Sequence, residues 1–279
     1  MVAGVDGCRA GWVVATLPAG AGRRSQPQTL ARAESNAEVD VEVDHVEVDD
    51  VEADPEVEVK VEIEIEVRVD AETDVQVEVV AGLDAVLERL TSGSLAVAGI
   101  DIPIGLPERG PRACDAEARS LLGPRRSSVF PAPVRAVLGA ATYADACAVS
   151  RAARGRAVSR QLFNILPKIR EADAALARAP GVRGRLFEMC PELSFAMLAG
   201  APLRFPKRTA AGRAERVDAL HRVFPTVDLT GIPTPRGAKP DDVLDALAGA
   251  WTARRVLAHA HLTLGGETDP TGLTMAVLA

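Results

Sequence analysis

The chain has 279 residues, of which 47% are hydrophobic and only 3% aromatic, so its core is expected to be mainly Ala, Val and Leu. No apolar run approaches the roughly 20 residues that a membrane-spanning helix needs, and the first residues lack the pattern of a secretion signal. We therefore expect a cytoplasmic protein with no membrane partner. The four cysteines are far apart without a CxxC spacing, which argues against a disulfide framework or a zinc site.

Charge is distributed unevenly along the chain, although its net value is only −7. Residues 38–80 contain 18 Asp and Glu residues and only two Lys and Arg residues, whereas 30 basic and 21 acidic residues lie outside this segment. Most of the chain is thus moderately basic. A basic body is compatible with a polyanionic partner such as nucleic acid.

The first predicted element is a β-hairpin, because apolar runs at 2–6 and 12–17 flank a glycine-rich turn. A loop is expected at 18–37. Residues 56–70 then alternate between aliphatic and mostly charged side chains, which predicts a strand of roughly 50 Å. A strand of this length must bend, protrude, or pair with the shorter runs at 39–44 and 75–80.

We interpret 38–80 as an acidic β insertion. Its charge is best explained as a means of keeping an exposed sheet edge from pairing with other chains. Adaptation to high salt and shielding of the basic body from nucleic acid are the alternatives. The aliphatic face of 56–70 is also a candidate edge for a homodimer.

The remaining elements alternate between helices and strands, which predicts an α/β protein with a mixed sheet flanked by helices. The sequence shows neither an internal repeat nor an interdomain linker, so we expect a single domain over 1–279. The expected helices cover 83–91, 112–122, 141–153, 159–179, 210–223 and 241–260, and the expected core strands cover 95–101 and 182–189.

Acidic residues follow two of the apolar strands. Asp6 ends the first run and Asp101 ends LAVAGID, and an isolated buried carboxylate is costly unless it is paired or binds a metal. Asp242 and Asp245 are three residues apart on a predicted helix and share one face. Oxygen ligands of this kind suit Mg²⁺ or Mn²⁺. Each Asp also has an ordinary structural explanation, as a turn or helix-cap residue.

Six ordered motifs resemble a family of prokaryotic proteins of unknown function that are classed as predicted nucleases with a ribonuclease H-like fold. The motifs are GVDGCRAGWVVA (4–15), IDIPIGLPERGPRACDAEAR (100–119), SSVFPAP (127–133), QLFNILPKIREAD (161–173), EMCPELSF (188–195) and DDVLDALAGAWTARR (241–255). The resemblance implies a mixed five-stranded sheet with three consecutive antiparallel strands followed by two parallel ones.

The resemblance also implies a catalytic centre with two divalent ions. Asp6, Asp101 and either Asp242 or Asp245 would be the ligands, and Glu188 and Glu192 are candidate supplementary ligands. The expected activity is hydrolysis of a phosphodiester by Mg²⁺ or Mn²⁺, with one ion activating water and the other stabilising the leaving oxygen. Basic residues near the motifs are candidates for binding the flanking phosphates: Arg109, Arg112, Arg125, Arg126, Lys168, Arg170 and Lys207.

Two other function classes stay open at this point. Actin-like phosphotransferases also begin with an Asp-Gly hairpin, but they need two such domains and this chain has one such hairpin. Stabilisation by ATP would favour that class. A non-catalytic module that binds nucleic acid or protein is the second alternative, and it would bind equally well without Mg²⁺.

Overall fold

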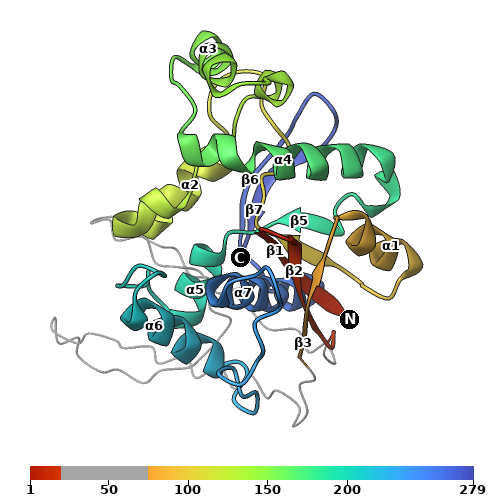
Figure 1. Cartoon of the computed structure of the whole chain (residues 1–279), viewed down its shortest axis with the longest axis vertical. Coiled ribbons are helices and arrows are strands. Elements are labelled where there is room, and N and C mark those ends of the chain that lie inside the picture. The colour runs from red at the N-terminus through yellow and green to blue at the C-terminus, as the bar shows by residue number, and fades with distance from the viewer. Residues whose placement is uncertain (20–74) are drawn as a thin grey trace, which may run out of the picture. The chain divides into compact units, whose positions relative to one another are not determined.

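Five strands form one mixed sheet in the order β3-β2-β1-β4-β5, seen near the centre of Figure 1. The structure is a computed structural model, and it describes residues 1–19 and 75–279. The predicted strand at 56–70 and the run at 39–44 lie outside the described residues. The α/β class and the mixed five-stranded sheet flanked by helices are confirmed.

The first three strands are antiparallel. β1 (Val2–Cys8) and β2 (Gly11–Leu17) form the predicted hairpin, in which Val5 pairs with Val14. β3 (Gln76–Val80) pairs with β2 and forms one edge of the sheet. The last residues of the segment that we assigned to the acidic insertion therefore belong to the main sheet.

The last two strands are parallel to β1 and shorter than predicted. β4 is Ala98–Ile100 and β5 is Leu186–Glu188. A 3₁₀ turn, η3 (Pro180–Val182), and a left-handed Gly184 with φ of 79° occupy the start of the strand that we predicted at 182–189. Backbone in these conformations cannot continue a strand ladder.

Helices connect these strands, and each helix that the sequence analysis predicts has a counterpart in the structure. The helices of the described residues are α1 (Asp84–Ser92), α2 (Ala113–Leu122), α3 (Tyr143–Arg154), α4 (Arg160–Arg178), α5 (Pro191–Ala199), α6 (Ala210–His221) and α7 (Pro240–Leu257). Two 3₁₀ segments, η1 (Gly123–Ser128) and η2 (Arg135–Gly139), lie between α2 and α3. α5 was not predicted.

The helices cover both faces of the sheet with separate hydrophobic clusters. Residues of α1 and α4 pack with Val5, Trp12 and Val14 on one face. Residues of α5, α6 and α7 pack with Val13 and Ala15 on the other, and Figure 1 shows α7 running beneath the strands. Within the described ranges, no helix combines the length and apolarity needed to cross a membrane.

A second, two-stranded sheet follows α7 and was also not predicted. β6 (Thr263–Thr268) and β7 (Thr274–Leu278) are antiparallel, with a register shift between Gly265 and Glu267. Leu264 and Val277 pack against buried residues of α2 and α5. This hairpin therefore covers the side of α2, next to the main sheet.

β1 and α7 approach each other closely through two glycines. A Cβ atom added at Gly4 would lie 1.9 Å from the Ala246 carbonyl oxygen, and one added at Gly249 would lie 3.0 Å from the Gly4 Cα atom. Only the absence of a side chain at both positions permits this contact. It places the middle of α7 directly against the strand that carries Asp6.

Candidate functional site

Asp6 and Asp101 lie side by side at the same end of the sheet. In the parallel pair β1–β4, Val5 is in register with Ile100, and the Asp101 backbone N–H donates to the Val5 carbonyl oxygen at 3.0 Å. The carboxyl ends of these neighbouring strands thus present both acids at one edge. Asp6 Oδ1 also accepts a hydrogen bond from the Gly7 N–H at 2.8 Å.

α7 brings a third carboxylate to this edge. Asp245 is only 2% exposed, and its Oδ2 accepts a hydrogen bond from Lys207 Nζ at 2.6 Å. Asp242 lies one turn earlier and is partly exposed, with Oδ2 accepting from the Lys239 backbone N–H at 2.8 Å. Asp242 thus acts as a helix-capping residue, whereas Asp245 is the buried acid of the pair.

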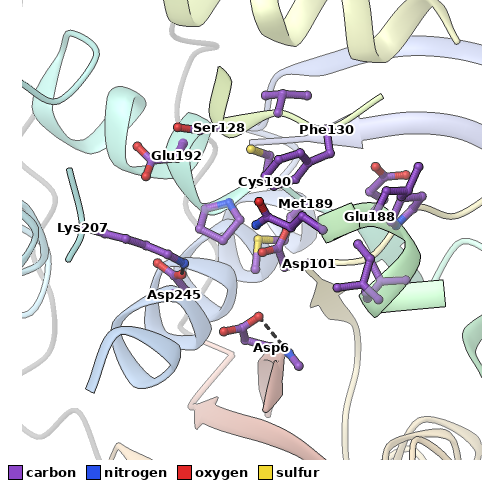
Figure 2. A pocket seen from close by; sticks show the side chains of 18 of the residues that line it. Asp6, Asp101, Ser128, Phe130, Glu188, Met189, Cys190, Glu192, Lys207 and Asp245 are labelled. Atoms are coloured by element: carbon purple, nitrogen blue, oxygen red, sulfur yellow. Dashed lines mark hydrogen bonds and ion pairs between the residues drawn. The ribbon is translucent and has the colours of Figure 1, made fainter. Parts of the chain in front are cut away.

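These three carboxylates line one pocket of about 600 Å³. Figure 2 shows Asp6, Asp101 and Asp245 around a common space, with Lys207 reaching Asp245 from the α5–α6 connection. Residues from β1, β5, α2, α4, α5 and α7, together with the residues directly after β4, contribute to its lining. The pocket therefore lies where the carboxyl ends of the parallel strands meet the start of α7.

The carboxylates in this pocket hold protons more tightly than free acids. The pKa of Asp101 is raised to about 7, chiefly by burial and then by the charges of Asp245 and Glu188, with Lys207 opposing the shift. Burial, with repulsion from Asp101 and Asp245, also holds the pKa of Asp6 well above its usual range. Burial raises the pKa of Asp245, although Lys207 opposes the shift. Burial thus disfavours the charged form of all three acids when no cation is bound.

This donor set fits a divalent cation in chemistry and charge. Carboxylate oxygens are the ligands that Mg²⁺ and Mn²⁺ prefer, and a cation would relieve the mutual repulsion of the acids. As the side chains stand, however, no group of three or more His, Cys, Asp or Glu residues within 1–19 and 75–279 is arranged to hold a metal ion. Lys207 instead supplies the positive charge at Asp245.

Glu188 lies at the same sheet end but is engaged in a buried ion-pair network. Both of its carboxylate oxygens accept hydrogen bonds from Arg112, at 2.6 and 2.7 Å, and one also accepts from the Ile104 N–H. Arg112 also pairs with Asp115 at 2.5 Å. Arg112 is only 2% exposed, so it does not fit the phosphate-binding role that we expected and instead fixes Glu188.

Glu192, on the first turn of α5, lines another side of the pocket. Its Oε1 accepts a hydrogen bond from the buried Arg216, and Arg125 lies 3.6 Å from the same oxygen. Its Oε2 is buried and has no hydrogen-bond partner within the described part of the chain. Glu192 therefore retains one oxygen for a further interaction.

The other expected phosphate-binding residues differ in position. Lys168 and Arg125 line the pocket, whereas Arg109 and Arg126 are exposed and lie outside its lining. Arg170 is held by the backbone, because it donates to the carbonyl oxygens of Leu138 and Ala140, at 2.6 and 2.5 Å. Three of the seven expected phosphate-binding residues therefore line the pocket, namely Arg125, Lys168 and Lys207.

Two polar residues of α4 that line the pocket were not singled out from the sequence. Gln161 and Asn164 line the pocket beside Lys168, and all three lie on α4. Their spacing of three and four residues places them on one helix face. This spacing is visible in QLFNILPKIR, so the sequence did contain the signal.

Comparison with known proteins gives a match that covers all six motifs quoted above, which lie between residues 4 and 255. A family model described as a protein of unknown function (DUF429) matches residues 4–269. The chain belongs to the DUF429 family. The resemblance to a family of unknown function is therefore confirmed, while the DUF429 description contains no nuclease activity. Neither the search of curated proteins nor that of solved structures gave a match.

Proposed function

We propose that the protein is a Mg²⁺- or Mn²⁺-dependent phosphodiester hydrolase of the ribonuclease H-like type. The observation that carries the proposal is the convergence of three carboxylates on one pocket: Asp6 on β1 and Asp245 on α7 are buried, and Asp101, directly after β4, is partly buried. Burial raises their pKa values, with mutual repulsion adding to the shifts of Asp6 and Asp101, and a bound divalent cation would offset both effects. Perturbed acids of this kind, clustered in a pocket, are typical of functional sites.

The sheet supports the ribonuclease H-like assignment. Three consecutive antiparallel strands followed by two parallel strands, in the order β3-β2-β1-β4-β5, are what the resemblance implies. Asp242 and Asp245 both line the pocket, and we take Asp245 as the helix ligand because it is buried, whereas Asp242 is partly exposed and caps the helix.

Asp6, Asp101 and Asp245 would hold the metal, which would activate water and stabilise the leaving oxygen when bound. The chain itself orients these acids, since the Gly7 N–H holds Asp6 and the β1–β4 ladder fixes the backbone of Asp101. Lys207 and Lys168 provide positive charge that attracts a phosphate to the pocket. Nucleic acid is the proposed class of partner.

Metal binding and hydrolysis test the proposal in two steps. Calorimetric titration with Mn²⁺ is expected to show saturable binding by the wild-type protein and its loss in Asp101→Asn. Asp218→Asn, which changes an exposed acid on α6, is the matched control and should bind as the wild type does. Hydrolysis of a panel of single-stranded, double-stranded and mononucleotide phosphodiesters should require Mn²⁺ or Mg²⁺ and Asp101. Activity that persists in EDTA would contradict the proposal.

A further inference from the structure

The size of the pocket limits the substrate. A volume of about 600 Å³ lies within the range of roughly 300–1,000 Å³ that is typical of small-molecule sites. Specific duplex recognition, in contrast, spreads contacts over roughly 1,000–2,500 Å² of protein surface. Asp245 and Asp6, at 2% and 8% exposure, offer little surface to the backbone of an intact duplex.

One face of α4 supplies neutral hydrogen-bonding groups to this pocket. Gln161 and Asn164 are exposed, and their carboxamides carry both donors and acceptors. Carboxamide side chains pair with the edges of nucleobases, most readily with adenine. Because carboxamides also pair with sugar hydroxyls, a sugar phosphate without a base is the comparison that tests this assignment.

The third residue of that face is a cation fixed near Asp6. Lys168 Nζ donates to the Gly11 carbonyl oxygen at 2.7 Å and lies 3.9 Å from the centre of the Trp12 ring. A Cβ atom added at Gly7 would lie 2.8 Å from Lys168 Cδ, so the lysine passes directly over the turn after Asp6. A phosphate at the carboxylates would therefore lie close to this ammonium group.

An apolar side completes the pocket. Phe130 and Ile165 are partly buried and belong to its lining, and Figure 2 shows Phe130 on the Cys190 side of the pocket, away from Asp6. Aromatic side chains stack on nucleobases. The pocket thus combines a stacking surface, amides for a base edge, a cation for phosphate and carboxylates at the bottom.

We propose that the substrate is a nucleotide-sized phosphate ester, in which one base lies along the α4 face and the phosphate lies at Asp6, Asp101 and Asp245. This inference rests on the proposed function for the position of the phosphate. A longer strand would bind only through an end or a base that has left the stack, because the pocket accommodates one nucleotide unit.

Equilibrium binding tests this inference without requiring hydrolysis. Adenosine 5′-monophosphate, ribose 5-phosphate and a short DNA duplex are titrated into the full-length protein by calorimetry, once in EDTA and once in Mn²⁺. Adenosine 5′-monophosphate should bind one to one and about tenfold more tightly than ribose 5-phosphate, in Mn²⁺ or in both buffers. The duplex should not displace it. Absence of nucleotide binding in both buffers, or displacement by the duplex, would overturn the inference.

Variants on α4 separate base recognition from phosphate binding. Asn164→Ala should weaken adenosine 5′-monophosphate about tenfold and leave ribose 5-phosphate unchanged, because it removes only hydrogen bonds to the base. Ala174→Asn, at an exposed position of the same helix outside the pocket lining, is the control and should change neither affinity. An Asn164→Ala variant that keeps the full preference would overturn the placement of the base.

The two proposals can fail independently. Tight nucleotide binding without metal-dependent hydrolysis of any ester would end the hydrolase proposal and leave the nucleotide site standing. Metal-dependent cleavage of a duplex without nucleotide binding would have the opposite effect.

Discussion

Asp101 is the residue at which the electrostatics of the site are most easily measured. Its pKa of about 7 in the folded protein exceeds the ordinary value of 3.8, so the folded state keeps a proton that the unfolded chain releases. The raised pKa values of Asp6 and Asp245 act in the same direction. Each of these groups therefore destabilises the fold as pH rises from about 4 through neutrality.

We predict that the metal-free protein loses roughly 1–3 kcal/mol of unfolding free energy between pH 5 and pH 8. Asp101→Asn should flatten this decline, because the amide has no proton to release. Urea unfolding in EDTA at several pH values measures the effect, and Asp218→Asn serves as the control. An identical pH slope in wild type and Asp101→Asn would show that Asp101 ionises as readily in the folded chain as in the unfolded one.

Lys207 holds the position at Asp245 that a metal ion would take in the proposed function. Asp245 Oδ2 accepts its hydrogen bond at 2.6 Å, and the ammonium group is the nearest compensation for a nearly fully buried carboxylate. Because the lysine side chain is 38% exposed and lies on a connection between helices, it can leave without disturbing the core. A divalent cation and Lys207 should therefore compete for Asp245.

Lys207→Met is expected to have opposite effects on stability and on metal binding. Loss of the ammonium group should destabilise the metal-free protein by about 2–4 kcal/mol, since it leaves a buried charge unpaired. It should raise the affinity for Mn²⁺ about tenfold, which corresponds to about 1.4 kcal/mol. Thermal unfolding with and without Mn²⁺ measures both effects, with Arg204→Met in the same connection as the control. Weaker Mn²⁺ binding by Lys207→Met would instead mean that the lysine supports the metal site.

At the scale of elements, the contact between β1 and α7 determines where the third acid lies. Gly4 and Asp6 lie on the same face of β1, because side chains alternate along a strand. Gly4 contacts the backbone of α7 near Ala246, one residue from Asp245. Any group that separates the strand from the helix therefore also separates Asp245 from Asp6.

Gly4→Ala should cost about 3 kcal/mol or more of stability, since its Cβ would lie 1.9 Å from the Ala246 carbonyl oxygen and backbone must move. Any folded fraction should also bind Mn²⁺ more weakly, although no proposed ligand has changed. Gly139→Ala is the matched control, because a Cβ there meets nothing within 4 Å. Urea unfolding and Mn²⁺ titration provide the two readouts. A Gly4→Ala protein as stable as Gly139→Ala would contradict the close approach.

The elements that the sequence did not predict have identifiable physical causes. Nearly every residue of α5 is buried, so its sequence lacks the polar face that makes a helix recognisable by periodicity. In β6, two glycines and a register shift interrupt the alternation that predicts a strand. The hairpin β1–β2 and α7 were predicted because their patterns are not interrupted in this way.

In the candidate site, too, some features could be predicted from the sequence and others could not. Asp6 and Asp101 could be predicted, because each carboxylate ends an apolar strand and such a group needs a partner. Which of Asp242 and Asp245 is the more buried could not, because one helix face carries both and their burial depends on tertiary packing. The pairing of Arg112 with Glu188, 76 residues later, depends on tertiary packing and leaves no local pattern.

At the scale of the whole molecule, the net charge of the chain depends on one acidic segment. Residues 38–70 contain 15 acidic and two basic residues, so replacing them with a short neutral linker makes the net charge positive. Their acidic β assignment and the homodimer edge at 56–70 lie outside the described residues. The boundary of 70 leaves β3 intact, since that strand begins at Gln76.

We predict that this replacement strengthens non-specific binding to DNA and makes it more dependent on salt, because a more positive surface releases more counterions from the polymer. Fluorescence anisotropy across a series of salt concentrations measures the slope. The control replaces residues 38–70 with a linker that has the length and the number of acidic residues of the native segment. An unchanged slope would show that the acidic segment does not shield the basic body.

The contact between Gly4 and Gly249 also has a consequence for the order of folding. The two residues are separated by most of the chain, and contacts of such long sequence separation form slowly because a large loop must close first. Asp6 and Asp101 can come together as soon as β4 pairs with β1, whereas Asp245 joins them only after α7 docks. The pocket should therefore be among the last parts of the molecule to mature during refolding, later than the hairpin on which it is built.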